Sequence, residues 1–199
     1  MPEDHTAIVQ VLVPVGMLGG GIPPGTVERG IELGADVIAI DGGSTDSGPH
    51  YLGTATAKTA RTAVHRDLAA VLPLAHAARI PVVIGSCGTA GTDAGVDWVY
   101  DIAAEIADTE GFTLQVARIT SEQDPDLLEK FLADDRIHPL DPAGPLDLST
   151  LHRCSHIVGL MGHEPIADAL TGGADLVLAG RATDTALTAA PVSASAIGS

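Results

Sequence analysis

The sequence has few aromatic residues, only two cysteines and no asparagine, and each shortage excludes something. Aromatic residues make up 3% of the chain, so alanine and the aliphatic residues must fill the core. Cys87 and Cys154 are too few for the disulfide framework of a small secreted domain, and a chain without asparagine cannot be N-glycosylated. No apolar run reaches the roughly 18 residues of a membrane-spanning helix, and the acidic first residues lack the basic start of a signal peptide. We therefore expect a cytoplasmic protein that does not enter a membrane.

Basic residues are also scarce, with 10 lysines and arginines against 26 acidic residues and a net charge of −16. A surface of this sign repels nucleic acid and anionic membranes, so we expect neither as a partner. Solubility or salt tolerance is the simplest explanation of the overall excess of acid. Lys58, Arg61 and Arg66 lie within a stretch of nine residues, so the few cations are concentrated in one segment.

The length of 199 residues and the 45% share of hydrophobic residues suit one domain with a sizeable core. We expect residues 1–191 to form a single α/β domain and residues 192–199 to be a tail of small residues. The range 136–148 is rich in proline and aspartate, which predicts an ordered connecting loop rather than a domain boundary.

Apolar runs and helical stretches alternate along the chain. Several of the runs are continuously apolar, which is typical of strands that are buried on both faces. The alternation predicts a doubly wound, Rossmann-like open sheet of about six mostly parallel strands, with helices on both faces. The expected strands are 8–15, 36–41, 81–85, 114–120, 156–160 and 175–179, and the expected helices are 24–33, 60–79, 93–110, 125–134, 147–153 and 164–171.

Three loops follow directly after expected strands, where open α/β sheets bind their ligands. The first loop, residues 41–53, has glycines that let backbone approach a ligand closely. Asp41 and Asp46 could act in it as base, acid or metal ligand. A turn-rich loop capped by aspartate and serine is the alternative interpretation.

A basic face follows the first loop. Lys58, Arg61 and His65 are three and four residues apart, so they share one side of a helix. In so acidic a protein, this face suggests an anionic ligand such as a carboxylate or a phosphate. Ion pairs with neighbouring acids are the alternative.

The second loop, residues 85–93, precedes a helix whose first N–H groups could bind an anion. Its glycine spacing is GxxGxxG, which is neither GxGxxG nor a Walker A motif, so it predicts no nucleotide site. Cys87 occupies a position that a nucleophile could take, but no neighbour in the sequence activates it. A small buried thiol is the simpler interpretation.

The third loop, residues 180–185, contains Arg181, which could hold a carboxylate through two hydrogen bonds. Thr183 or Asp184 could instead cap the next helix.

Two weaker candidate positions follow the fourth and fifth expected strands. Glu122 could add a carboxylate, although Asp124 beside it is equally suited to helix capping. His163 could transfer protons, and Glu164 follows it, but the run that continues with Pro165 is not the HExxH zinc signature. A divalent cation held by carboxylates is a possible cofactor, although no spacing of the residues demands one.

Five ordered segments of the sequence resemble the N-terminal domain of the acyclic terpene utilisation (AtuA-like) family. The resemblance covers about residues 34–191. It rests on IDGGSTDSGPHYLG, TARTAVHRDL, VVIGSCGTAGTD, SHIVGLMGHEPIADAL and GADLVLAGRATDTAL.

The resemblance implies a bacterial metabolic enzyme with an acidic or CoA-linked substrate. Family members are longer, which implies a homo-oligomer or a partner chain that supplies the C-terminal portion. The residues that match the family's polar motifs are Asp41, Ser47, Tyr51, Arg61, Arg66, Asp67, Ser86, Gly88, Gly91, Glu122, His163, Glu164, Arg181 and Asp184.

Together these features predict an enzyme of the lyase, hydratase or isomerase type that acts on a small carboxylate or acyl-CoA thioester by acid–base chemistry. We expect the proton-transfer residues to be Asp41, Asp46, His163 and Glu164. We expect the substrate-binding residues to be Ser47, Tyr51, Arg61, Arg66, Ser86, Gly88, Gly91, Arg181 and Asp184. The rival hypothesis is a non-catalytic binding or assembly subunit that needs a partner chain to complete its sheet and site.

Overall fold

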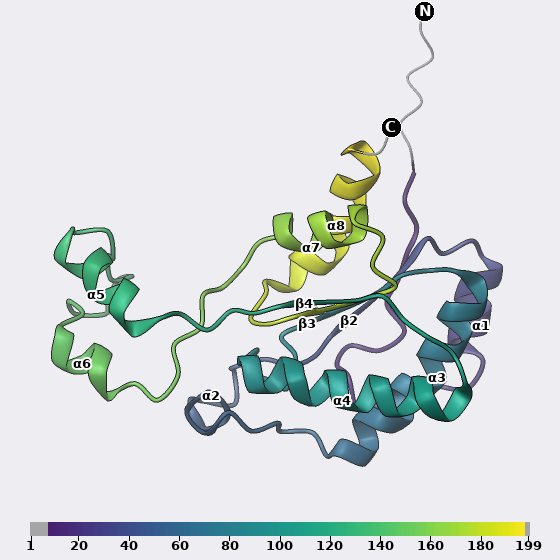
Figure 1. Ribbon diagram of the computed structural model, residues 1–199, viewed down its shortest axis with the longest axis horizontal. Helices are drawn as coiled ribbons and strands as arrows, with labels where there is room; N and C mark the ends of the chain where they lie inside the picture. The colour runs from purple at the N-terminus through teal and green to yellow at the C-terminus, as the bar shows by residue number, and fades with distance from the viewer. Residues whose placement is uncertain (1–7, 198–199) are drawn as a thin grey trace, which may run out of the picture.

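The computed structural model describes residues 8–197, and Figure 1 shows a central sheet with helices on both of its faces. The expected doubly wound, parallel α/β architecture is confirmed. In chain order the elements are β1 (Val11–Leu12), α1 (Thr26–Glu32), β2 (Val37–Asp41), α2 (His50–Thr54), α3 (Arg61–Ala78), β3 (Val82–Gly85), α4 (Asp93–Glu110), β4 (Val116–Ile119), α5 (Pro125–Ala133), α6 (Leu148–Arg153), α7 (Glu164–Thr171), β5 (Leu176–Ala179) and α8 (Asp184–Ile197).

The strands are ordered β1-β2-β3-β5-β4, and every neighbouring pair is parallel. The sheet therefore has five strands where about six were expected. The range 156–160 lies outside the sheet and forms only an isolated antiparallel bridge between Val158 and Glu122, because it pairs with the segment that follows β4. Of the range 8–15, only β1 pairs with β2.

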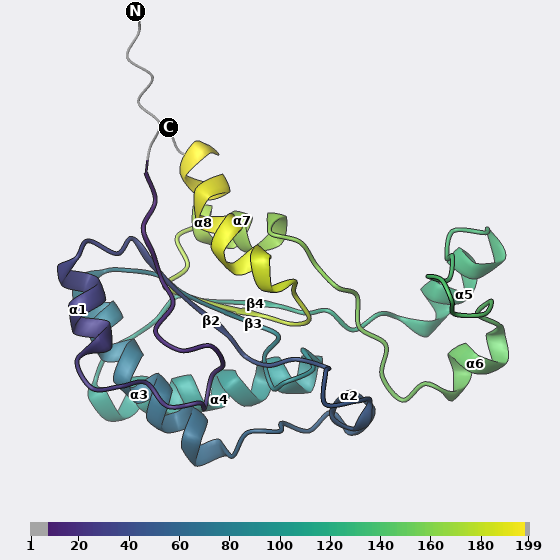
Figure 2. The same ribbon diagram turned by 180° about the vertical axis from the view of Figure 1, so that it is seen from behind.

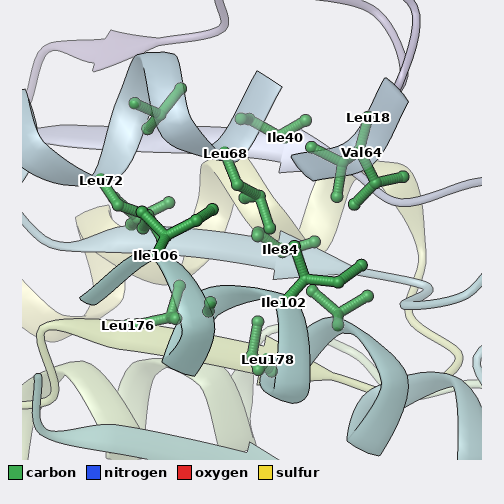
Figure 3. Close-up of a cluster of buried hydrophobic side chains, with 14 of the residues drawn as sticks. Leu18, Ile40, Val64, Leu68, Leu72, Ile84, Ile102, Ile106, Leu176 and Leu178 are labelled. Carbon is green, nitrogen blue, oxygen red and sulfur yellow. The ribbon is translucent and has the colours of Figure 1, made fainter. Parts of the chain in front are cut away.

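Two apolar clusters cover the two faces of the sheet, because successive side chains of a strand point to opposite sides. In β2, Ile38 and Ile40 join the cluster beneath α3 and α4, whereas Val37 and Ala39 join the cluster beneath α7 and α8. Figure 3 shows the first cluster, in which leucine and isoleucine side chains of the helices meet those of the strands. Aliphatic side chains thus supply the bulk of the core, as the scarcity of aromatic residues predicts.

The helices after two neighbouring strands lie on opposite faces of the sheet. α4 follows β3 and packs with α3, whereas α8 follows β5 and packs with α7 on the other face (Figures 1 and 2). The chain thus leaves β3 and β5 in opposite directions, which opens a crevice between their carboxyl ends. This switch point is where doubly wound sheets bind ligands.

The chain between β4 and α7 forms an arm that projects from the sheet and carries α5 and α6 (Figures 1 and 2). No residue of α5 is buried, and Leu151 is the buried residue of α6. The range 136–148, expected as a connecting loop, joins these two helices.

The C-terminal helix α8 continues through residues 192–197 of the expected tail. No helix within residues 8–197 is long and apolar enough to cross a bilayer.

Candidate functional site

The loops after β3 and β5 are locked together at the switch point. The Ser121 hydroxyl donates a hydrogen bond to the Gly91 carbonyl at 2.6 Å and accepts one from the Arg181 backbone N–H at 2.8 Å. Gly91 has φ +74°, and a Cβ on it would lie 2.2 Å from the Arg181 nitrogen, so only glycine fits there. The backbone that carries Arg181 is therefore fixed in place.

The loop after β3 is buried throughout residues 85–92, so much of it is structural. The Ser86 hydroxyl donates to the Ala182 carbonyl at 3.2 Å, which ties this loop to the loop after β5. Burial raises the pKa of the Cys87 thiol far above its ordinary value. Cys87 therefore stays a thiol at neutral pH, and the interpretation of it as a buried packing residue fits better than a nucleophilic role.

The Arg181 guanidinium lies over the switch point. Its closest polar neighbours are two hydroxyls, Ser86 Oγ at 3.5 Å and Thr45 Oγ1 at 3.4 Å. Within residues 8–197 it makes no salt bridge, although acids far outnumber bases in this chain. Both contacts are long, so the guanidinium can turn its N–H groups to an anionic ligand.

Asp41 ends β2 beside this guanidinium. Burial raises the pKa of the Asp41 carboxyl above its ordinary value, and the charges of Asp184 and Asp46 add to the rise. The hydrogen bond from the Gly43 N–H and the charge of Arg181 act in the opposite direction. The structure thus brings these predicted site residues into one electrostatic group.

A pocket of about 190 Å³ opens next to this group. The carboxylates of Asp41 and Asp184 are its acidic lining, and they are the side chains here that could contact a divalent cation. Within residues 8–197, no three histidine, cysteine, aspartate or glutamate side chains converge as a metal site. The pocket lining is Val13, Gly16, Ala39, Asp41, Asp184, Leu187 and Thr188.

The remaining residues of the first loop lie further along it. The Ser47 hydroxyl accepts a hydrogen bond from Lys58 Nζ at 2.6 Å. Tyr51 is in α2, where its ring meets the His50 ring edge to face at 5.2 Å between centroids. Asp46 donates its backbone N–H to Ser44 Oγ at 2.9 Å, which shapes the turn.

Arg61 and Gly88 line a separate pocket of about 360 Å³ with Trp98. Arg61 donates to Glu105 Oε2 at 2.6 Å, and this hydrogen bond lowers the pKa of the Glu105 carboxyl. The His65 ring lies 3.8 Å from the same carboxylate. The alternative of ion pairs therefore describes Arg61 and His65 on the basic face.

Arg66 is held by its neighbour Asp67, whose carboxylate is buried on α3. The same carboxylate accepts the backbone N–H groups of Gly19 at 2.8 Å and Gly21 at 3.0 Å. This arrangement fixes the loop that precedes α1, so its evident role is structural.

His163 and Glu164 begin α7. The segment before them runs beside the third loop, because Met161 donates its N–H to the Arg181 carbonyl at 2.9 Å. The His163 ring and the Glu164 carboxylate are 3.8 Å apart, and the Glu164 side chain is 73% exposed. The pair is thus near the switch point, but its two members hold each other only loosely.

Sequence reasoning missed three residues that the structure places at or near this edge. Thr45 lies in the first loop, and nothing in the sequence distinguishes its hydroxyl from those of the other serines and threonines there. Ser121 matters only through contacts with loops 30 and 60 residues away in the chain. His156 hydrogen-bonds the Glu122 carboxylate at the root of the arm, and it was hidden in a range expected to be a strand.

Comparison with known proteins gives one match. Residues 34–195 match the family model described as "Acyclic terpene utilisation family protein AtuA". The match covers more than half of the chain and includes all three strand-end loops. No curated protein matches the chain, and no solved structure matches it.

Proposed function

The chain belongs to the acyclic terpene utilisation family AtuA, and on this premise we propose that it is a metabolic enzyme acting on a small carboxylate or acyl thioester by acid–base chemistry. The family supports a metabolic role. The reaction type that fits the side chains is that of a lyase, hydratase or isomerase, because each needs an anion holder and groups that move protons.

The Arg181 guanidinium, which has no carboxylate partner among residues 8–197, is the observation that carries the proposal. It lies at the switch point on a backbone fixed by Ser121 and Gly91. A carboxylate or a thioester enolate placed there would receive two N–H groups and would replace two long hydroxyl contacts. Binding costs little reorganisation, because the guanidinium is already in position.

Asp41 is the best placed group for proton transfer at this position. A carboxyl whose pKa is raised by burial keeps its proton closer to neutral pH, which suits a general acid or base. It lies beside Arg181, whose charge would stabilise the anion formed when a proton is removed. Asp46 and the loosely paired His163 and Glu164 are the further candidates for a second proton-transfer group.

The test is a thermal-shift and calorimetric titration with acetyl-CoA, butyrate and glutarate. Specific ligands stabilise only the folded protein that binds them. Arg181→Ala should weaken binding at least about tenfold, or roughly 1.4 kcal/mol, without lowering the melting temperature of the free protein greatly. Arg29→Ala, which removes an exposed arginine paired with Glu32, is the matched control and should bind as the wild type does. Equal binding by wild type and Arg181→Ala would remove the anion-holding role.

A second candidate function is a binding or assembly subunit, and the projecting arm favours it. Leu127, Leu140 and Leu148 on the arm are 41%, 85% and 50% exposed, and α5 buries no residue. Apolar side chains presented on a projecting element are typical of surfaces that pack against another chain. Size-exclusion chromatography with light scattering decides between the two. A monomer that binds one of the three ligands by itself would count against an obligatory assembly role.

A further inference from the structure

Two cations flank the first loop without a carboxylate partner. Arg181 reaches the loop from the third strand-end loop and contacts Thr45 Oγ1 at 3.4 Å. Lys58 reaches it from the segment before α3 and donates to Ser47 Oγ at 2.6 Å. Neither cation makes a salt bridge to any carboxylate of residues 8–197. The first loop is thus held from two sides by cations through neutral hydroxyls.

Within residues 8–197, four of the ten lysines and arginines take a carboxylate partner and six do not. Arg29, Arg61, Arg66 and Arg118 each take a carboxylate partner in this acidic chain. The other cations that have no carboxylate partner within the described residues are outside the loops of the switch point: Arg79 at the end of α3, and Lys130, Arg136 and Arg153 on the arm.

The backbone of Lys58 is fixed although its side chain is exposed. Its N–H donates to Thr89 Oγ1 at 2.9 Å, and Thr89 is only 1% exposed. Thr89 belongs to the buried loop after β3, the same loop that contributes Ser86 to the surroundings of Arg181. One rigid loop therefore anchors Lys58 and contacts the Arg181 guanidinium.

The two hydroxyls that these cations contact belong to one short turn of the first loop. Thr45 and Ser47 are two residues apart, so their Cα atoms lie at most about 7 Å apart. The Gly48 N–H donates to the Thr45 carbonyl at 2.9 Å, which closes a turn and shortens the span further. A small molecule with one anionic group at each end could contact both cations at once.

We propose that the site takes a substrate with two anionic groups, one held by Arg181 and the other by Lys58 across the Thr45–Gly48 turn. This inference rests on the proposed function and names its substrate class. Lys58 is then a residue that determines specificity, because it adds affinity only for the second anionic group. Either a dicarboxylate or a thioester whose carrier bears phosphates has the required chemistry.

The experiment compares binding of butyrate, glutarate and acetyl-CoA by calorimetry, with wild type, Arg181→Ala and Lys58→Met. Butyrate carries one anionic group, glutarate two carboxylates and acetyl-CoA phosphates, so the three probes separate the possible sources of the second charge. Lys58→Met should weaken glutarate or acetyl-CoA about two- to fivefold, the upper part of the range for a solvent-exposed ion pair, and should leave butyrate binding unchanged. Lys130→Met, which removes the chain's other lysine from the arm, should change none of the three.

The outcomes separate the two proposals. Suppose that Arg181→Ala weakens the binding of all ligands. If Lys58→Met then weakens none of them, or weakens butyrate as much as glutarate and acetyl-CoA, the second anion site is overturned and the proposed function stands. If Arg181→Ala changes no binding, the proposed function is overturned as well. If wild type binds glutarate and acetyl-CoA no more tightly than butyrate, the inference also fails. Raising the salt concentration should weaken the doubly anionic ligand more than butyrate, since the Lys58 contact is exposed.

Discussion

The backbone of Gly91 lies directly against the backbone of Arg181, so that a Cβ added to Gly91 would be 2.2 Å from the Arg181 nitrogen. Gly91→Ala must push these two loops apart and must also hold alanine at a φ of +74°. We expect a loss of about 3 kcal/mol in the free energy of unfolding, measured by urea denaturation.

Gly111→Ala is the matched control for this prediction. Gly111 has φ +75° at the end of α4, but a Cβ there would meet no atom within 4 Å. Backbone strain alone should cost about 1 kcal/mol. Equal losses in the two variants would show that the contact between the loops adds nothing.

Asp67→Asn should destabilise the loop before α1. The buried carboxylate accepts two backbone N–H groups and pairs with Arg66. A neutral amide has one acceptor oxygen and no charge, so it can keep only some of these contacts. We expect a loss of about 2 kcal/mol in the free energy of unfolding. Arg66→Ala should cost less, because the Arg66 side chain is 60% exposed. A larger loss in Arg66→Ala than in Asp67→Asn would contradict the dominant role of the backbone contacts.

The two cysteines should differ in reactivity toward Ellman's reagent. Cys87 is fully buried and its pKa is raised, whereas Cys154 is exposed. One thiol should react quickly in the folded protein, and the second should react only when urea unfolds the chain. Cys154→Ser should abolish the fast phase. A fast phase that persists in that variant would contradict the burial of Cys87.

Asp41→Asn should stabilise the protein at neutral pH. Burial raises the pKa of Asp41 in the folded state, so the folded chain binds this proton more tightly than the unfolded chain does. The charged carboxylate therefore lowers stability increasingly as the pH rises through the folded-state pKa, and asparagine removes this penalty. The gain over wild type, measured by thermal unfolding, should be present at pH 7 and should vanish as the pH falls below 3.8.

Asp147→Asn provides a control of opposite sign. The hydrogen bond from the Thr150 N–H lowers the pKa of Asp147, so its charge adds stability above the ordinary pKa and loses that contribution as the pH falls. This variant should be less stable than wild type at pH 7, and the difference should fade in acid. A gain in Asp147→Asn, or a loss in Asp41→Asn, at pH 7 would contradict these assignments.

The local pattern of the sequence determined the fold class and most of the elements. Runs such as Val82–Gly85 are apolar at every position, and only a strand covered on both faces can bury them all. The start of α5 was also predictable, since Asp124, a candidate helix cap in the sequence, accepts the Asp126 N–H. The prediction of a sheet strand over 156–160 was wrong, because Val158 of this range pairs with Glu122 and not with a strand of the sheet. The local pattern of the sequence does not reveal which segment an apolar run pairs with.

The sequence by itself determined which loops lie at the carboxyl edge of the sheet, because strand order along the chain and the parallel direction suffice for that. Only the tertiary structure decided which cations pair with carboxylates and which contact hydroxyls instead. Arg61 meets Glu105 and Arg66 meets Asp67. Within residues 8–197, Arg181 instead meets the hydroxyls of Thr45 and Ser86, and Lys58 meets the hydroxyl of Ser47. The physical reason is that an ion pair depends on distance in space, and residues 44 positions apart, such as Arg61 and Glu105, become neighbours only when α3 packs against α4.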